Sequence, residues 1–325
     1  MSGILELAAA NLISPIILSF VLGLFAAFAR SDLSIPEAIA KGMSIYLLFA
    51  IGFKGGASVA GHGVDGTLLA AIGAGLVLSF GLPFIAFAIL RGLTGLPLKD
   101  AASVAAHYGS ISIVTFVAAT SVLEGRGIPS EGYMVAVAAA MEAPAILSAL
   151  WLIARSGGGA SMDGALMREI MFNGSIVLLI GSFAIGMITG DKGLEEIAPF
   201  IVTPFKGVLC LFLLDMGLIA GRGLRESRGV IGPRVVLFGL AMPLIGAGIG
   251  LALGLLVGLS LGGVVLMMVL AASASYIAVP AAMRVALPEA NPAVSLTLSL
   301  GITFPFNLTV GIPLYLAVAL TVIGG

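Results

Sequence analysis

Charged side chains are scarce in this sequence. Asp, Glu, Lys and Arg make up 10% of the 325 residues, 60% are hydrophobic, and the mean hydropathy is +1.20. A water-soluble domain of this composition would expose large apolar patches, so an integral membrane protein is expected. The 45 glycines agree, because helices in lipid associate through small residues that let their backbones approach closely.

The sequence also lacks a large net charge, because its 15 Lys and Arg residues nearly balance its 16 Asp and Glu residues. This balance predicts no nucleic-acid partner. Cys210 is the only cysteine and His62 and His107 are the only histidines, too few for a structural zinc site or a disulfide framework. The sequence has no phosphate-binding glycine loop, zinc motif or nucleophile elbow, so we expect no resident cofactor and neither a primary pump nor an enzyme.

Long apolar stretches dominate what is present. A membrane span needs roughly 20 largely apolar residues, and the chain divides at its charges, prolines and glycine clusters into about ten such segments. The first apolar run begins near Asn11 and is long enough to span, so it is read as a helix, not a cleavable signal. The predicted segments are 11–29, 36–53, 67–90, 99–122, 131–154, 169–189, 197–220, 234–257, 260–285 and 293–322.

Lys and Arg are distributed unevenly between the loops of this arrangement. Cytoplasmic loops retain positive charge during insertion, and ten Lys or Arg side chains fall in the odd-numbered loops against three in the even-numbered ones. The ten are Arg30, Arg91, Lys99, Arg155, Arg168, Arg222, Arg225, Arg228, Arg234 and Arg284; the three are Lys54, Arg126 and Lys192. Both termini are therefore predicted to be extracytoplasmic, and the glycine-rich stretch 156–160 to be a cytoplasmic joint between halves 1–160 and 161–325.

Two matches within the chain suggest that these halves are repeats. Lys41-Gly42 followed by Gly52 and Gly56 superposes, 165 residues on, upon Lys206-Gly207 followed by Gly217 and Gly221. At an offset of 161, Pro144 in Glu142-Ala143-Pro144 superposes on Pro305 and Ser112 on Ser273. Because five spans per half is an odd number, the second copy must be inverted. The predicted fold is all-α, with about ten transmembrane helices in two inverted five-helix repeats.

Segments four and nine carry small and polar residues at mid-membrane depth, in 101–115 and 271–280. Such residues predict broken helices, which lipid tolerates only where the freed backbone lines a cavity. Two such helices crossing near the midplane would point half-helix N-termini at one spot and form an anion site completed by hydroxyl groups. The alternative is that each hydroxyl only bonds a carbonyl one turn back and bends its helix. The predicted substrate-binding residues are Gly109, Ser110, Ser112, Thr115, Ser273, Ser275 and Tyr276.

Ionisable residues within the segments are the second signal, because a charge in the bilayer interior is costly and commonly marks an ion pathway. Glu142 precedes a proline that breaks its helix and is predicted to bind a coupling cation or proton, with Thr303 and Asn307 as further candidates. Asp215 could equally be neutralised in an interhelical or intersubunit contact. His107 is expected to be a packed, hydrogen-bonded side chain in preference to a ligand.

The order of short motifs resembles the sodium-dependent bicarbonate transporter family. The stretch from segment nine into ten carries most of this resemblance, and Met141-Glu142-Ala143-Pro144-Ala145 is similar to the family's methionine-aspartate-isoleucine-proline-alanine. The matching residues of that stretch are 260–265, 271–273, Pro280, Arg284, Pro288, 290–292 and 311–314. The resemblance implies ten helices, a core domain sliding against a gate domain, a homotrimer, and bicarbonate and sodium bound around the broken helices.

The sequence departs from the family pattern at these sites. Val114 stands where the family has the second serine of segment four, and Tyr276 stands where segment nine of the family has an aspartate. Phe304 replaces the threonine before the segment-ten proline. The departures predict weak sodium dependence, and the short segment between the halves argues against regulation by a soluble nucleotide-sensing partner.

The function predicted from the sequence is secondary active transport of bicarbonate or a similar small monoanion across the cell (inner) membrane, with Na⁺ or H⁺ as the coupling ion. A passive anion channel or facilitator is the first alternative, because the missing aspartate could leave the site uncoupled. A non-transporting membrane sensor that binds an anion is the second. A membrane enzyme has the least support, since no paired catalytic groups are present.

Overall fold

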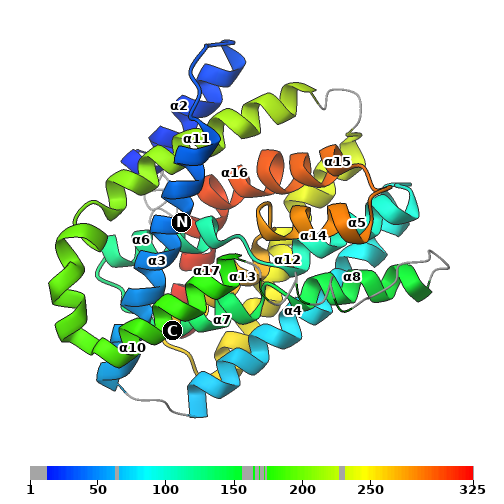
Figure 1. Cartoon of the computed structure of the whole chain (residues 1–325). Coiled ribbons are helices and arrows are strands. Elements are labelled where there is room, and N and C mark those ends of the chain that lie inside the picture. Colours follow the sequence, from blue (N-terminus) through cyan, green and yellow to red (C-terminus); the bar gives the residue numbers. More distant parts are fainter. Residues whose placement is uncertain are drawn as a thin grey trace.

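The regular secondary structure of the described residues is entirely helical. Figure 1 is a computed structural model. It describes residues 13–62, 66–155, 164, 168, 172, 174–226 and 231–324. The joint predicted at 156–160 and the predicted cytoplasmic Arg228 lie outside these residues.

The bounds of the described helices are as follows. In chain order they are α2 (Pro15–Phe28), α3 (Glu37–His62), α4 (Gly66–Leu93), α5 (Leu98–Gly109), α6 (Ile113–Gly125), α7 (Met134–Ala140), α8 (Pro144–Arg155), α10 (Gly174–Ile201), α11 (Phe205–Glu226), α12 (Pro233–Val257), α13 (Leu261–Ala272), α14 (Ala278–Ala286), α15 (Pro292–Leu296), the π-helix η1 (Thr297–Thr303), α16 (Phe304–Phe306), the π-helix η2 (Asn307–Gly311) and α17 (Ile312–Ile323).

Eight helical stretches of the described residues are long and apolar enough to cross a membrane. The prediction of a multi-pass membrane protein is therefore confirmed. Two shorter apolar helices, α2 and α13, occupy the places of the first and ninth predicted segments. The count of ten spans and the inverted repeat stay predictions.

Several of the predicted segments are interrupted. Segment four is divided between α5 and α6, and segment nine between α13 and α14. Residues 141–143 separate α7 from α8, just before Pro144, whose ring nitrogen has no hydrogen to donate. Gly190 kinks α10 with φ 59° and ψ −152°, a conformation that a residue with a Cβ rarely adopts. Segment ten contains the two π-helical stretches η1 and η2.

Close glycine contacts pair α3 with α10. A Cβ on Gly56 of α3 would collide with the carbonyl oxygen of Phe183 in α10. Gly186 of α10 fits in the same way against the carbonyl oxygen of Phe53 in α3. The two backbones therefore touch along one face, as expected of helices packed in lipid.

The same kind of contact pairs α2 with α11. Gly217 of α11 lies against the carbonyl oxygen of Phe20 in α2, and Gly23 of α2 lies against the carbonyl oxygen of Leu214 in α11. We call α2, α3, α10 and α11 the glycine-packed group. This group runs along the left and upper part of Figure 1. The remaining helices, α4 to α8 and α12 to α17 with η1 and η2, form a second body that we call the broken-helix group.

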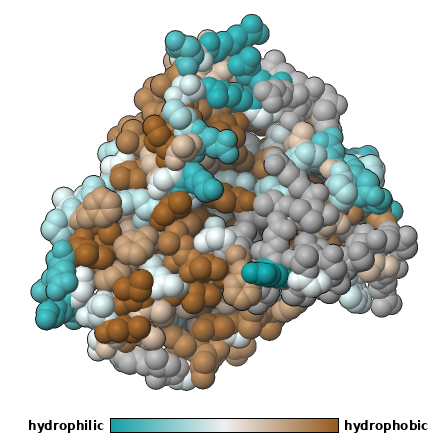
Figure 2. Space-filling model, viewed as in Figure 1, coloured by the Kyte–Doolittle hydropathy of each residue, from teal (hydrophilic) through white to brown (hydrophobic). Residues whose placement is uncertain are grey.

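Much of the described surface on one face of the molecule is apolar. Figure 2 shows brown, hydrophobic residues spread over much of the visible face. Ile188 of α10 and Leu256 of α12 are 80% and 81% exposed, which is expected of side chains that face lipid. Lys41 and Lys206 are both exposed, as expected of side chains that reach towards the interface.

Candidate functional site: two touching helix breaks

The breaks of segments four and nine contact each other directly in the interior. The Ser112 backbone N–H donates to the Ser273 hydroxyl at 2.9 Å. The Ser275 N–H donates to the His107 carbonyl at 2.8 Å, and the His107 ring nitrogen Nδ1 lies 2.6 Å from the Ser275 carbonyl oxygen. Backbone groups freed by each break thus find partners on the other, as an interrupted helix in lipid requires.

The half-helices around this contact are arranged crosswise. Helix α6 packs beside α13, and α5 packs beside α14. The N-terminus of α6 is capped by Ser112, whose hydroxyl oxygen accepts from the Thr115 N–H at 3.2 Å. The start of α14 has a weaker cap, a Val279 N–H to Ser275 hydroxyl contact of 3.5 Å. Both half-helix N-termini, with their partial positive charge, therefore begin beside the contact.

Four hydroxyl groups at the breaks have a hydrogen that no acceptor in the described residues receives. Ser110 and Tyr276 are buried and form no hydrogen bond of good geometry, although the Tyr276 phenol lies close to the Ser112 hydroxyl. Ser112 and Ser275 use their oxygens only as acceptors. Since a hydroxyl has one hydrogen to donate, these four side chains present unused donors in a buried polar region.

Other predicted substrate residues are already engaged. Thr115 donates its hydroxyl hydrogen to the Ser112 oxygen at 2.9 Å. Ser273 donates to the Leu270 carbonyl at 2.9 Å while it accepts from Ser112. Gly109 is required for packing, because a Cβ there would collide with the Pro83 ring. Their geometry makes these three residues part of the scaffold of the breaks.

The predicted coupling residues also differ in whether their polar atoms already have hydrogen-bond partners. Glu142 is 4% exposed, and its Oε2 atom has no hydrogen-bond partner. Thr303, by contrast, donates to the Gly239 carbonyl at 2.7 Å, so the 2.6 Å contact with Tyr108 is a bond that the phenol donates. Of these three, Glu142 alone has an unused oxygen.

Asn307 is tied to the end of the broken segment nine. Its amide nitrogen donates to the carbonyl of Ala272, the last residue of α13, at 2.9 Å, and its amide oxygen accepts from the Tyr315 hydroxyl at 2.8 Å. The described contacts therefore give Asn307 a role in holding the break open. Whether Asn307, Thr303 or Glu142 meets an ion is still a prediction.

Sequence reasoning undervalued His107 and did not consider Tyr108. His107 was expected to be packed and hydrogen-bonded, and its Nδ1 is; its other ring nitrogen, Nε2, is buried without a partner. Tyr108 was not considered because an aromatic residue in an apolar helix is most often core. The available signal was the position of both residues in the last turn before a predicted break.

A comparison with models of known protein families identifies the family of this chain. Residues 15–320 match the model of the Na⁺-dependent bicarbonate transporter superfamily. The chain belongs to this superfamily. The match spans nearly the whole chain and confirms the resemblance seen in the sequence motifs. No curated protein matches the chain.

Membership in a Na⁺-dependent bicarbonate transporter superfamily supports a role in transport and sodium as a coupling ion. The described residues contain no group of three or more His, Cys, Asp or Glu side chains placed to hold a metal ion.

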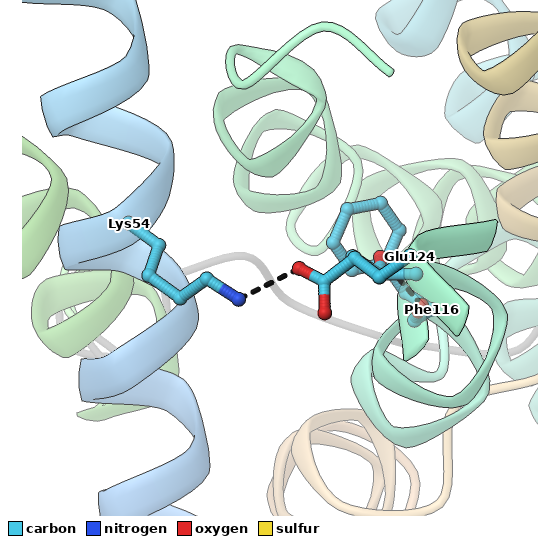
Figure 3. A network of polar contacts seen from close by, with 4 residues as sticks. Lys54, Phe116 and Glu124 are labelled. Atoms are coloured by element: carbon cyan, nitrogen blue, oxygen red, sulfur yellow. Dashed lines mark hydrogen bonds and ion pairs between the residues drawn. The ribbon is translucent and has the colours of Figure 1, made fainter. Parts of the chain in front are cut away.

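A second polar region in this superfamily member lies between its two bodies. Lys54 of α3 forms an ion pair with Glu124 of α6 at 2.7 Å, drawn in Figure 3. The pair lines a cavity of about 160 Å³, and a neighbouring cavity of about 400 Å³ shares Ser130 and Glu131 with it. The ion pair thus joins the glycine-packed group to the broken-helix group beside a cavity.

Asp215 is buried as well, at 5% exposure, on α11 of the glycine-packed group. It was predicted either to lie on an ion pathway or to be neutralised in a contact. No hydrogen bond or ion pair of its carboxylate is found within the described residues. The choice between the two predictions stays open to experiment.

Proposed function

We propose that this protein is a secondary active transporter of bicarbonate or a similarly small monoanion. The observation that carries the proposal is the set of unused donors on Ser110, Ser112, Ser275 and Tyr276, gathered where two broken helices touch. An anion bound there would accept from these hydroxyls and meet the positive ends of α6 and α14. No arginine or lysine is needed for such a site.

The helix contacts support the proposal of two inverted repeats. Gly56 meets the Phe183 carbonyl, and Gly217, 161 residues further along the chain than 56, meets the Phe20 carbonyl. Phe53 and Leu214 are separated by the same 161 residues and receive the corresponding glycines of the partner helices. This offset equals the one between Ser112 and Ser273. The contacts favour a register for α3 and α11 one helical turn away from the offset of 165 that Lys41 and Lys206 suggested.

We further propose alternating access, in which the glycine-packed group acts as the gate and the broken-helix group as the core. The pairs α3 with α10 and α2 with α11 are closely packed, whereas the contacts between the two groups, α11 with η1, α10 with α7 and α3 with α7 and α6, are smaller and include the ion pair of Lys54 and Glu124. A homotrimer, implied by the family resemblance, would hold the gates together while the cores move.

The proposed orientation places both termini outside the cell (inner) membrane and the connection between α11 and α12 in the cytoplasm. Its basis is the distribution of Lys and Arg over the loops. Single-cysteine labelling in a Cys210→Ala background tests it. Reaction of an introduced cysteine at Arg225 with an impermeant reagent in right-side-out vesicles would overturn the orientation.

Proteoliposome flux tests the proposed function. Radiolabelled bicarbonate uptake should exceed electrochemical equilibrium when a cation gradient is applied. Uptake that only reaches equilibrium under every gradient would show the passive channel or facilitator. Binding without any flux would show the sensor.

A further inference from the structure

The His107 ring is held in one tautomer by its surroundings. Nδ1 lies 2.6 Å from the Ser275 carbonyl oxygen, and a carbonyl oxygen can only accept. Nδ1 therefore carries the hydrogen of this bond. The Ser275 N–H, donated back to the His107 carbonyl at 2.8 Å, fixes the two residues on both sides.

The other nitrogen of the ring must then be an acceptor. An imidazolium would bury a positive charge with no carboxylate bonded to it, so the neutral ring is favoured. In the neutral ring with hydrogen on Nδ1, Nε2 has a lone pair and no hydrogen. His107 is 1% exposed, and Nε2 has no partner in the described residues. A buried acceptor without a donor costs free energy unless a ligand or water supplies one.

The same ring lines a cavity between α5, α14 and α15. The cavity has a volume of about 100 Å³, enough for roughly three water molecules or one small anion. Two further polar side chains, Ser103 and Ser295, line it, and the rest of the wall is apolar, formed by Pro280, Met283, Leu287, Pro288, Ala290 and Pro292. Ser103 is four residues before His107, one turn along α5, and therefore lies on the same face.

We propose that this cavity is a binding subsite for a small oxyanion that carries its own O–H group, and that His107 selects for that group. The ligand's O–H would donate to Nε2, while its charged oxygens would accept from hydroxyls such as that of Ser103. Hydrogencarbonate has both features. Formate, nitrate and chloride lack the O–H group and would leave Nε2 unpaired.

This inference rests on the proposed function and narrows its substrate class from small monoanions to protonated oxyanions. Sites that hydrogen-bond a substrate hydroxyl reject analogues without it, because a buried polar group is then left unsatisfied. The selection would come from His107 alone, since the hydroxyl donors at the breaks can serve any anion equally.

The test measures binding instead of flux, so that it stays informative if transport itself fails. Affinities for bicarbonate and formate are determined by calorimetry on the purified protein in nanodiscs. The variant His107→Asn places an amide N–H near the position of Nδ1, keeping the bond to the Ser275 carbonyl, but removes the acceptor Nε2. Ser121→Ala, a buried and unpartnered hydroxyl on α6, is the matched control.

We expect the parent and the Ser121→Ala control to bind bicarbonate about tenfold or more tightly than formate, the discrimination of one hydrogen bond to a charged ligand. His107→Asn should lose this preference by weakened bicarbonate binding, with formate affinity unchanged. A folded His107→Asn protein that still prefers bicarbonate, or a parent with no preference, would overturn the inference. Selective binding in a protein without flux would instead contradict the proposed transport alone.

Discussion

Ser112 and Ser273 are joined by one hydrogen bond, from the Ser112 N–H to the Ser273 hydroxyl, but their hydroxyl hydrogens are used differently. Ser273 donates to Leu270 and so is saturated by the scaffold. Ser112 accepts from Thr115 and retains its own hydrogen. Their equivalent positions at an offset of 161 suggested equal roles. Because their hydrogen bonds differ, the proposed function would have Ser112 donate to the anion and Ser273 support the break.

We expect Ser112→Ala to weaken bicarbonate binding by about 1–3 kcal/mol, the range for loss of a hydrogen bond to a charged partner. The substitution also removes the cap of α6. Equilibrium binding of the purified variant measures the effect, with Ser121→Ala as the control on the same helix. Unchanged affinity in a properly folded variant would place the anion elsewhere.

Ser273→Ala is expected to act on the scaffold first. It removes the acceptor of the Ser112 N–H, which would be left buried and unpaired at a cost of about 1–3 kcal/mol. Thermal unfolding in detergent should therefore occur at a lower temperature than for Ser112→Ala. If Ser273→Ala were fully stable but bound no anion, Ser273 would be a direct ligand.

At the scale of helices, close packing and weak polar contacts have opposite functions. The backbones of α3 and α10 touch at Gly56 and Gly186, which is the packing expected of two helices that form one rigid unit. The ion pair between Lys54 and Glu124 joins the two bodies, but both side chains are partly exposed, and such pairs contribute only about 0–1 kcal/mol. A contact of that size is weak enough to break and re-form, as the proposed alternating access would require.

Two glycines of α10 allow a direct test of the packing. A Cβ at Gly186 would collide with the Phe53 carbonyl, whereas a Cβ at Gly181 would meet no atom within 4 Å. Gly186→Ala should destabilise the protein by about 1–3 kcal/mol, the usual cost of overpacking. Gly181→Ala should be neutral or slightly stabilising, because alanine favours a helix more than glycine does. Equal unfolding temperatures for the two variants would contradict the close packing of α3 on α10.

At the scale of the whole molecule, the sequence predicted the features that have local causes. The length of the apolar segments predicted the membrane-spanning helices. The polar stretches at 101–115 and 271–280 predicted both helix breaks. The kink at Gly190 and the π-helical stretches of segment ten were not predicted, because no local pattern distinguishes them from ordinary helix. The hydrogen-bond partners of the hydroxyls also include groups that are distant in the sequence, such as the Ser112 N–H, which donates to the Ser273 hydroxyl from 161 residues away.

The register that relates α3 to α11 could not be predicted from the sequence either. Lys-Gly matches in a glycine-rich chain suggested an offset of 165, while the backbone contacts of Gly56 and Gly217 favour 161. A shift of one turn leaves the same helix face in contact, so composition cannot distinguish the two registers. Only the positions of the facing carbonyl groups do so.

The coupling of transport to a cation depends on what replaces the family's aspartate at Tyr276. A neutral phenol offers a hard cation one weak oxygen instead of a full negative charge. The phenol of Tyr276 is buried without a partner, and Glu142 is the buried carboxylate with an unused oxygen among the predicted coupling residues. Membership in a Na⁺-dependent superfamily favours sodium, while these two residues favour a contribution from Glu142.

We expect replacement of sodium by an inert organic cation, at fixed pH, to lower initial bicarbonate uptake by less than about tenfold, because the site lacks the carboxylate that would make sodium binding tight. Glu142→Gln, which keeps the shape and removes the charge, should abolish uptake against a gradient. Glu289→Gln, which changes an exposed carboxylate paired with Lys99, is the control. A larger drop without sodium, together with normal coupling in Glu142→Gln, would assign the coupling to sodium bound at the breaks, because Glu142 would then have no part in it.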